Sequence, residues 1–303
     1  MTAGHRPGLP PLHLLLALAV MAVWGTNFVV IKQALSHLPP LTLAALRFVF
    51  AFLPFALFFK RPAVSWSNLA AYGVLIGAGQ FGLLFTAMRS DITPGLASLV
   101  VQVQVFFTIG LSMRLSGERV APYQLAAMAL AAGGLGTIAL HTDGSATPLG
   151  LLLVVGAALC WALGNMTARA AGSVNMLAYV VWSSAFAVPP LLAMALVTEG
   201  WPRMSAGIAA ADSTTWAAVI WQSVGNTMFG YAAWGWLLHR HPAASVTPLA
   251  LLVPVFGLGA SALLLGEPLQ PWKLIAFALV MAGLSLGLLW PRLSPRLFGS
   301  LPS

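Results

Sequence analysis

Only 7% of the 303 residues are charged, 59% are hydrophobic, and the mean hydropathy is +0.90. Soluble domains carry roughly a quarter charged residues, so this chain could not cover its own surface in water, and the apolar stretches of about 20 residues exclude a disordered protein. The net charge is +8, but the basic residues stand singly or in pairs at the ends of these stretches, which argues against a nucleic-acid partner.

In chain order, the apolar stretches predict ten membrane-spanning helices with short connections. They are continuously apolar rather than alternating, which favours helices over the strands of a membrane barrel. Each is long enough to cross a hydrocarbon core of about 30 Å. We therefore expect an all-α integral membrane protein with spans at 12–35, 41–59, 67–88, 93–114, 121–140, 148–169, 175–198, 214–237, 243–264 and 271–290.

The basic residues between the spans predict the orientation of the chain. With a cytoplasmic N-terminus, nine Lys and Arg residues fall on the cytoplasmic side and four on the opposite side, in agreement with the positive-inside rule. The segments 1–11 and 291–303 are therefore expected to be cytoplasmic tails of a multi-pass protein in a bacterial-type inner membrane.

An internal repeat predicts two related halves, 12–140 and 148–290. When the chain is shifted by 149 or 137 residues, motifs of the first half fall on counterparts in the second. These are Gly117-Glu118 with Gly266-Glu267, Ala127 with Ala276, Gly134 with Gly283, and Trp24 with Trp161. Five spans in each half, an odd number, mean that the second half inserts upside down. Inverted repeats rock about a midplane site in many transporters, although duplication also builds membrane scaffolds.

Several short motifs recur in order along both halves. They are Trp24-Gly25-Thr26-Asn27-Phe28, Leu46-Arg47-Phe48, Pro254-Val255-Phe256 and the two Gly-Glu pairs after spans 4 and 9. Over nearly the whole chain they resemble the drug/metabolite transporter superfamily, EamA type, and the chain is most similar to YddG-like bacterial exporters of amino acids and related metabolites. This resemblance implies ten helices in a 5+5 inverted repeat around a central cavity lined by spans 1, 3, 4, 6, 8 and 9.

Polar side chains inside the spans form the candidate site. Such groups are costly at bilayer depth unless they have partners or face a wet cavity. Trp24 and Asn27 share one helix face, as do Trp161 and Asn165, so each half offers an indole beside an amide. The expected substrate-binding residues are Trp24, Asn27, Gln80, Gln102, Trp161, Asn165, Gln222 and Asn226. The alternative for each is a hydrogen bond between packed helices.

Arg47 is a charge placed well inside a span. It could attract an anionic group of the solute, or it could bond helix-end carbonyls or extend toward an interface. Because the resemblance places it on a helix outside the expected cavity, the structural role is favoured. Lys32, at the outer end of span 1, could meet the solute or mark the interface. Three prolines could act as gating kinks or be tolerated in a packed bundle, namely Pro94, Pro248 and Pro254.

An aromatic, amide-lined cavity indicates a neutral or zwitterionic solute. We expect an alternating-access exporter of small metabolites, aromatic or hydrophobic amino acids in particular, with other amphiphilic metabolites or drugs as the alternative. No Asp, Glu or His lies in the middle of a span, which favours facilitated export over proton coupling, the other possibility.

Other classes of function are less well supported by the residues in the spans. A nucleophile with a base, paired aspartates or a His-Glu metal motif is missing there, so we expect neither an enzyme nor a metal or cofactor site. A receptor or structural protein remains a lower-ranked alternative. The expected partners are a small-molecule substrate and the lipid bilayer, and a monomer is favoured.

Overall fold

The computed structural model describes residues 9–116, 121–141, 143–241 and 243–297, and these are largely helical. Glu118 of the repeat motif lies outside the described residues. The first half contains α1 (Pro11–Ala34), α2 (Pro40–Phe52), η1 (Phe55–Leu57), α3 (Trp66–Gly73), η2 (Val74–Gly82), α4 (Leu83–Ser90), α5 (Pro94–Val100), η3 (Val101–Val103), α6 (Gln104–Ser116) and α7 (Pro122–Ala139).

The second half contains α8 (Pro148–Ala170), α9 (Met176–Thr198), α10 (Trp201–Ala210), α11 (Ser213–Ile220), η4 (Trp221–Phe229), α12 (Gly230–Arg240), α13 (Ala243–Val246), η5 (Thr247–Leu251), α14 (Leu252–Leu265) and α15 (Pro271–Leu297). The segments η2 and η4 are π-helices, whereas η1, η3 and η5 are 3₁₀-helices. Several labels therefore belong to one continuous helical stretch, as in 66–90, 94–116 and 213–240.

Local chemistry sets many of the helix boundaries. Proline occupies the first turn of several helices, where its missing N–H would have no intrahelical partner, as at Pro40, Pro94 and Pro148. At the start of α9 the side chain of Asn175 accepts hydrogen bonds from backbone N–H groups of the first turn. Gly266 ends α14 with a φ of 67°, a left-handed conformation that glycine adopts without a steric penalty.

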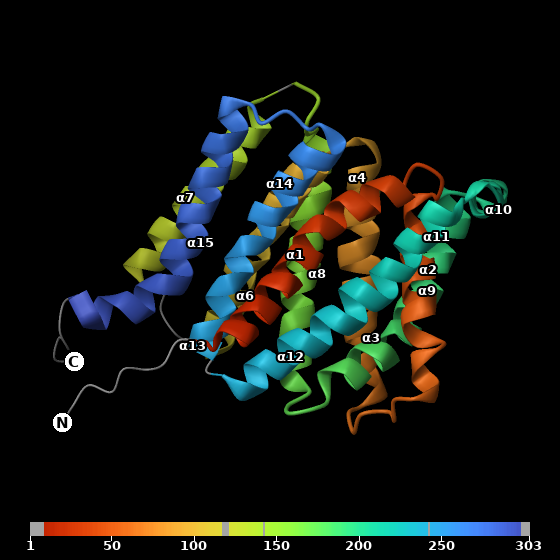
Figure 1. Ribbon diagram of the computed structural model, residues 1–303, viewed down its shortest axis with the longest axis horizontal. Helices are drawn as coiled ribbons and strands as arrows, with labels where there is room; N and C mark the ends of the chain where they lie inside the picture. Colours follow the sequence, from red (N-terminus) through yellow and green to blue (C-terminus); the bar gives the residue numbers. More distant parts are fainter. Residues whose placement is uncertain (1–8, 117–120, 142, 242, 298–303) are drawn as a thin grey trace.

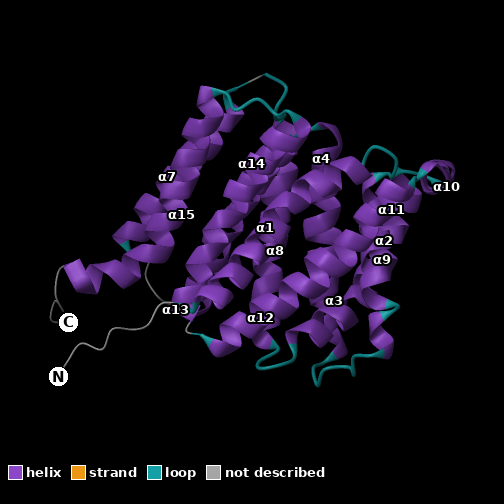
Figure 2. Ribbon diagram, in the orientation of Figure 1, coloured by secondary structure: helices purple, strands orange, loops and turns teal. Residues whose placement is uncertain are grey.

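Helices α7 and α15 lie side by side at one edge of the bundle (Figures 1 and 2). Their contact depends on two glycines. A Cβ atom added to Gly134 would lie 2.9 Å from the carbonyl oxygen of Ala276, and one added to Gly283 would lie 2.6 Å from that of Ala127. The two contacts are reciprocal, since each helix supplies one glycine and one carbonyl, and the small residues let the backbones approach closely.

The rest of the bundle is held together by pairs of helices from opposite halves of the chain. Helix α1 packs against α14, α2 against α9, and α8 against η2 and α6. At the first of these contacts a Cβ on Gly25 would lie 2.6 Å from the carbonyl oxygen of Val253. Helix α2 also contacts both π-helices, so α2, α9, η2 and η4 meet in one region.

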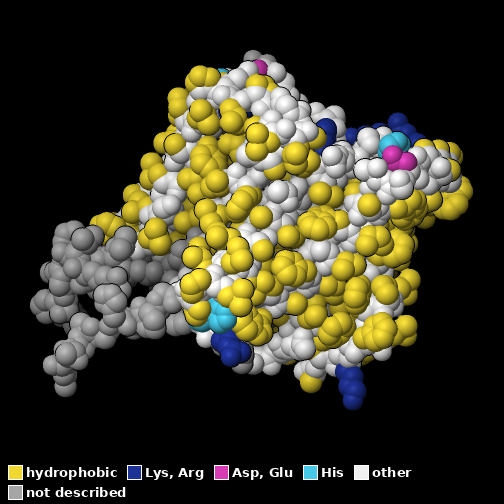
Figure 3. Space-filling model, viewed as in Figure 1, with side chains coloured by type: hydrophobic (Ala, Val, Ile, Leu, Met, Phe, Trp, Pro, Cys, Tyr) yellow, Lys and Arg dark blue, Asp and Glu magenta, His cyan; other side chains and the backbone are white. Residues whose placement is uncertain are grey.

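The surface is that of a membrane protein. Leu57, Val197 and Leu263 are 85%, 86% and 86% exposed. Figure 3 shows hydrophobic side chains across the middle of one face, with charged side chains toward its ends. Within the described residues seven helices are long and apolar enough to cross a membrane: Pro11–Ala34, Pro40–Leu57, Trp66–Ser90, Pro94–Leu111, Pro148–Ala170, Met176–Thr198 and Pro271–Trp290. The chain is therefore an all-helical, multi-pass membrane protein.

Three more helical stretches were expected to span the membrane, and they fall outside this set of seven. They are α7, the stretch 213–240, and the stretch 243–265, which includes a shorter apolar helix at Leu249–Leu265. The total of ten spans therefore remains a prediction. The connection between the expected spans 175–198 and 214–237 contains the ten-residue helix α10.

The three candidate gating prolines lie at different places in their helical stretches. Pro94 begins α5, whereas Pro248 and Pro254 lie inside the continuous stretch 243–265, in η5 and α14. A missing N–H needs no compensation in a first turn, so Pro94 does not require a kink, and the gating role of the three prolines stays a prediction. Helix α9 contains two further prolines in its interior, Pro189 and Pro190, which were not among the three candidates.

Candidate substrate-binding site

A buried polar cluster joins α1, α2 and η4. It consists of Asn27, Arg47, Gln222, Ser223 and Thr227, and we call it the Arg47 cluster. Nη1 of Arg47 donates to Oε1 of Gln222 at 2.8 Å, and Nη2 donates to Oγ1 of Thr227 at 3.2 Å. Nδ2 of Asn27 donates to the same Gln222 oxygen at 3.4 Å. All five residues are buried, with at most 3% of their surface exposed.

The π-helix η4 presents several of these groups together. Backbone bonds in a π-helix run over five residues, and such segments occur frequently at functional sites. Oγ1 of Thr227 donates to the carbonyl oxygen of Gln222, five residues earlier, at 2.9 Å. Oγ of Ser223 donates across the helix contact to the carbonyl oxygen of Arg47, also at 2.9 Å. These bonds turn the polar side of η4 toward α1 and α2.

The positive charge of Arg47 has neutral neighbours. No acidic side chain among the described residues pairs with Arg47. Its guanidinium carbon lies 3.7 Å from the centroid of the Phe81 ring, which is a cation–π contact. Three buried polar atoms of the cluster have no hydrogen-bond partner: Oδ1 of Asn27, Nε of Arg47 and Nε2 of Gln222. The cluster therefore holds its cation in place while leaving part of its bonding capacity unused.

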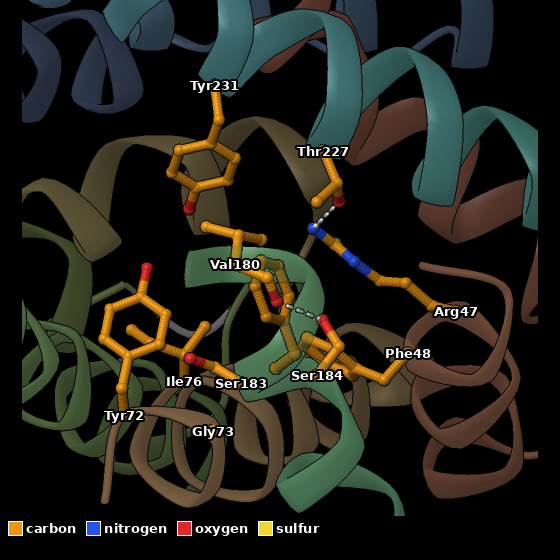
Figure 4. Close-up of a pocket in the computed structure, with 11 residues that line it drawn as sticks. Arg47, Phe48, Tyr72, Gly73, Ile76, Val180, Ser183, Ser184, Thr227 and Tyr231 are labelled. Atoms are coloured by element: carbon orange, nitrogen blue, oxygen red, sulfur yellow. Dashed lines mark hydrogen bonds between the residues drawn. The ribbon is translucent and has the colours of Figure 1, made fainter. Parts of the chain in front are cut away.

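A small cavity lies next to Arg47, between α2, α3, η2, α9, η4 and α12. Figure 4 shows the hydroxyl groups of Tyr72 and Tyr231 pointing toward one another at this cavity. Its empty space, including the solvent at its opening, amounts to about 290 Å³, and its interior has room for about one water molecule. The lining residues are Arg47, Phe48, Tyr72, Gly73, Ile76, Phe81, Val180, Ser183, Ser184, Thr227 and Tyr231.

An aromatic wall adjoins the Arg47 cluster on the side of α1. The indole Nε1 of Trp24 donates to the carbonyl oxygen of Asn226 at 3.2 Å. The Trp24 ring lies 5.9 Å from Tyr231 and 5.6 Å from Trp234, measured between ring centroids. A Cβ atom on Gly230 would come within 2.3 Å of Nε1, so glycine is required where the indole crosses η4 and α12.

The other expected indole–amide pair has different neighbours. Nδ2 of Asn165, on α8, donates to Oε1 of Gln104 at 3.1 Å and to Oγ1 of Thr108 at 3.4 Å, both on α6. Trp161 is partly buried against the main apolar core. The two pairs therefore do not converge on one set of contacts: the pair on α1 faces η4 and α12, whereas Asn165 faces α6.

The eight expected binding residues thus fall into two groups. Trp24, Asn27, Gln222 and Asn226 meet between α1 and η4, whereas Trp161 and Asn165 lie on α8. Gln80 and Gln102 are 5% and 6% exposed and lie on η2 and η3, both of which pack against α8. The sequence interpretation missed Tyr72, Tyr231, Ser183 and Ser184, because a tyrosine or serine in an apolar helix gives no signal of which neighbour it faces.

The structure gives contacts for the two cations singled out in the sequence. Arg47 lines the small cavity described above. Nζ of Lys32 donates to the carbonyl oxygens of Met88 and Arg89, at 3.0 and 2.8 Å. Lys32 therefore caps the C-terminal end of α4, where a helix has unpaired carbonyl groups. The described residues contain no group of three or more His, Cys, Asp or Glu that could hold a metal ion.

Comparison with known proteins identifies the family. The family model for EamA-like transporters matches this chain twice, over residues 11–140 and 148–289. The chain belongs to the EamA-like transporter family. It is therefore a membrane transporter.

Curated relatives cover most of the chain. A protein of Salmonella typhimurium named "probable amino-acid metabolite efflux pump" is 41% identical over 275 residues, 89% of this chain and 92% of its own length. An Escherichia coli protein of the same name is 39% identical over 288 residues, covering 91% and 96%. A "probable terminal-alkyne amino-acid exporter" of Streptantibioticus cattleyicolor is 26% identical over 278 residues, covering 88% and 90%.

A solved crystal structure shares the fold of this chain. The two superpose with a TM-score of 0.60 over 92% of this chain and 97% of the other, at 19% sequence identity. At this identity the likeness supports the helical arrangement and says nothing further about the solute.

Proposed function

We propose that this EamA-family transporter exports small zwitterionic or neutral metabolites, amino acids in particular, by alternating access. The observation that carries the proposal is the Arg47 cluster, a set of fully buried polar groups that joins helices of both halves and keeps unpaired donors and acceptors. Buried polar groups inside a membrane are costly, and their usual purpose is a solute or ion pathway. The amino-acid exporter names of the relatives support the same substrate class.

We further propose that the chain crosses the membrane ten times as two inverted five-helix halves. Two features of the described residues support this arrangement. The contacts of Gly134 with Ala276 and of Gly283 with Ala127 are reciprocal, as a two-fold relation between the halves requires. Nine-residue π-helices, η2 and η4, also occupy the same place in the third expected span of each half, 67–88 and 214–237. Halves related in this way can rock about a shared site.

The proposed cycle starts from a closed arrangement. Ligand pockets for small molecules usually enclose about 300 to 1,000 Å³ in a continuous space. The empty volume beside Arg47 is smaller than this range, so an amino acid would enter only after the halves separate on one side. Closure would follow on that side, and opening on the other side would release the solute. We propose that the solute enters from the cytoplasmic side, where we expect both chain ends to lie. Release on the opposite side of the inner membrane is then export.

The direct test measures solute flux in vesicles that contain the purified protein. Flux of free amino acids, with and without a pH gradient, distinguishes facilitated export from proton coupling. We expect flux of aromatic and hydrophobic amino acids that does not require the gradient. A requirement for the gradient would replace facilitated export by proton coupling, and flux restricted to other amphiphiles would support the alternative substrate class.

Trp24→Ala tests the proposed aromatic wall. The variant loses the indole hydrogen bond and two ring contacts, so we expect about tenfold lower flux, equivalent to about 1.4 kcal/mol. The matched control is Trp201→Ala, because Trp201 is 64% exposed on α10. Unchanged flux in a Trp24→Ala protein with normal yield would remove Trp24 from the site.

A further inference from the structure

Arg47 is a buried cation that has no acidic partner within the part of the chain that the structure describes. Only 2% of the surface of Arg47 is exposed. Among the described residues, Asp91, Asp212 and the other acids bond groups at helix ends and loops instead. An uncompensated buried charge costs several kcal/mol, so a protein normally either pairs such a charge or replaces it. A buried cation that is kept without an anion requires an explanation.

The neighbours of Arg47 orient it without neutralising it. Gln222 and Thr227 each accept one of its hydrogen bonds, and the Phe81 ring covers the guanidinium plane. A guanidinium has five N–H donors, and Nε has no partner here. The side chain is therefore fixed in direction while donors remain for a further acceptor.

The orientation of the two amides follows from the chemistry of arginine. A guanidinium only donates, so the Gln222 atom that faces it at 2.8 Å must be the oxygen, Oε1. That oxygen can only accept, so Asn27 must approach it with its nitrogen, Nδ2. The remaining atoms are then fixed as one donor, Nε2 of Gln222, and one acceptor, Oδ1 of Asn27, and both are unpaired.

The unpaired groups match the two ends of an α-amino acid. Nε of Arg47 and Nε2 of Gln222 are donors, which suit a carboxylate. Oδ1 of Asn27 is an acceptor, which suits an ammonium group. Carboxylates bind arginine with short, charge-assisted hydrogen bonds, often through two oxygens at once.

We propose that Arg47 is the carboxylate-binding residue of the transport site, with Gln222 as a second donor and Asn27 facing the ammonium group. This proposal rests on the proposed transport function and narrows its substrate to amino acids with a free carboxylate. The substrate supplies the anion that the fold lacks. Because Arg47 lies on α2 and Gln222 on η4, a bound carboxylate bonds both halves of the chain, which links substrate binding to their relative position.

The experiment compares phenylalanine with phenylalaninamide, which lacks the carboxylate. Flux in vesicles and thermal stabilisation in detergent are measured for both compounds with each protein. We expect the unmodified chain to transport phenylalanine at least about tenfold better than the amide. In Arg47→Gln this preference disappears, because phenylalanine flux falls at least about tenfold while amide flux changes less than about twofold. Arg203→Gln, on the exposed side of α10, is the matched control and keeps the preference.

A second variant guards against misfolding of Arg47→Gln. Gln222→Glu provides a carboxylate of the chain itself beside Arg47, so folding is maintained or improved by the new ion pair. We expect this variant to lose phenylalanine flux, because its own carboxylate occupies the anion site. Phenylalanine flux close to normal in Gln222→Glu would overturn the proposal.

The outcomes separate the two levels of inference. If the unmodified chain transports both compounds equally, or if Arg47→Gln retains its preference for phenylalanine, the carboxylate assignment is wrong while transport stands. If the unmodified chain transports no solute of a broad amino-acid and amphiphile panel, the transport proposal fails and the assignment fails with it.

Discussion

Among the residues whose burial the structure describes, two cations are almost completely buried, and their surroundings differ in charge. Lys273 is 0% exposed and its Nζ lies 3.1 Å from Oε1 of Glu267. Arg47 is 2% exposed and has neutral partners among the described residues. The first cation meets a fixed anion at one end of the bundle, between α14, α5 and α15. The second lies in the middle of α2, beside a cavity.

The surroundings of Glu267 show what a purely structural buried charge requires. Besides Lys273, its carboxylate accepts hydrogen bonds from Thr93 Oγ1 at 2.5 Å, from the N–H of Gly95 at 3.1 Å and from Ser261 Oγ. It therefore caps the first turn of α5 and joins α14 to α15. The strong acceptor positions of the Glu267 carboxylate are therefore all occupied by hydrogen-bond donors. The Arg47 cluster differs in keeping three unpaired atoms, as our proposal that it binds an added partner requires.

Glu267→Ala should have the largest effect on stability. The substitution leaves Lys273 buried without an anion and removes the cap of α5. Breaking a buried pair on one side costs about 3 to 5 kcal/mol. Thermal unfolding in detergent, followed by loss of monodisperse protein, would measure the change. A loss similar to that caused by a substitution at an exposed position would show that the pair contributes no net stability.

Replacing each cation by methionine compares the two sites directly. Lys273→Met leaves Glu267 buried with its other three donors, so we expect a loss of about 1 to 3 kcal/mol, the cost of removing one partner of a buried hydrogen-bonded group. Arg47→Met removes an uncompensated charge, so its unfolding free energy should change by less than about 1 kcal/mol or increase, because apolar replacement of buried charges is often neutral or stabilising. A larger loss at Arg47 than at Lys273 would reverse the comparison.

The helical membrane fold could be predicted from the sequence because hydropathy along the chain reports a local property. A run of about 20 apolar residues has few alternatives to a membrane helix. The residues of the glycine contact between α7 and α15 had been aligned as repeat pairs, Gly134 with Gly283 and Ala127 with Ala276, but their contact was not predicted. An internal repeat indicates that two segments are related, and only the packing of the helices brings them together.

The interior of the site could be predicted only in part, because its bonds cross the chain. Arg47 and Gln222 are 175 residues apart, and no local pattern connects them. Asn27 and Gln222 were singled out as buried amides, but their common partner was not. The π-helices were missed since a bond over five residues is selected by packing rather than by residue type. The carbonyl partners of Lys32 could not be predicted because they lie on another helix.

Asp212 is an exposed carboxylate that caps a helix, whereas Glu267 is buried. Substitution of Asp212 should therefore have the smallest effect on stability. Asp212 caps α11, accepting bonds from Oγ1 of Thr215 at 2.7 Å and from its N–H at 2.8 Å. These two bonds, to the side chain and then to the backbone of Thr215, hold the pKa of Asp212 below its ordinary value. The ionised form is thus favoured in the folded state.

The sign of its pH dependence follows from that direction. A carboxyl group with a lowered folded pKa adds stability above its unfolded pKa of about 3.9, and this contribution is lost as pH falls through the folded value. Asp212→Asn should therefore unfold at a slightly lower temperature than the unmodified chain at pH 7, with a difference smaller than that for either cation variant. The difference should shrink below about pH 4. A difference in unfolding temperature that stays constant from pH 7 to pH 3 would contradict this prediction. It would mean that Asp212→Asn is destabilised by altered cap geometry, because an effect of the lost carboxylate charge must disappear once Asp212 is protonated.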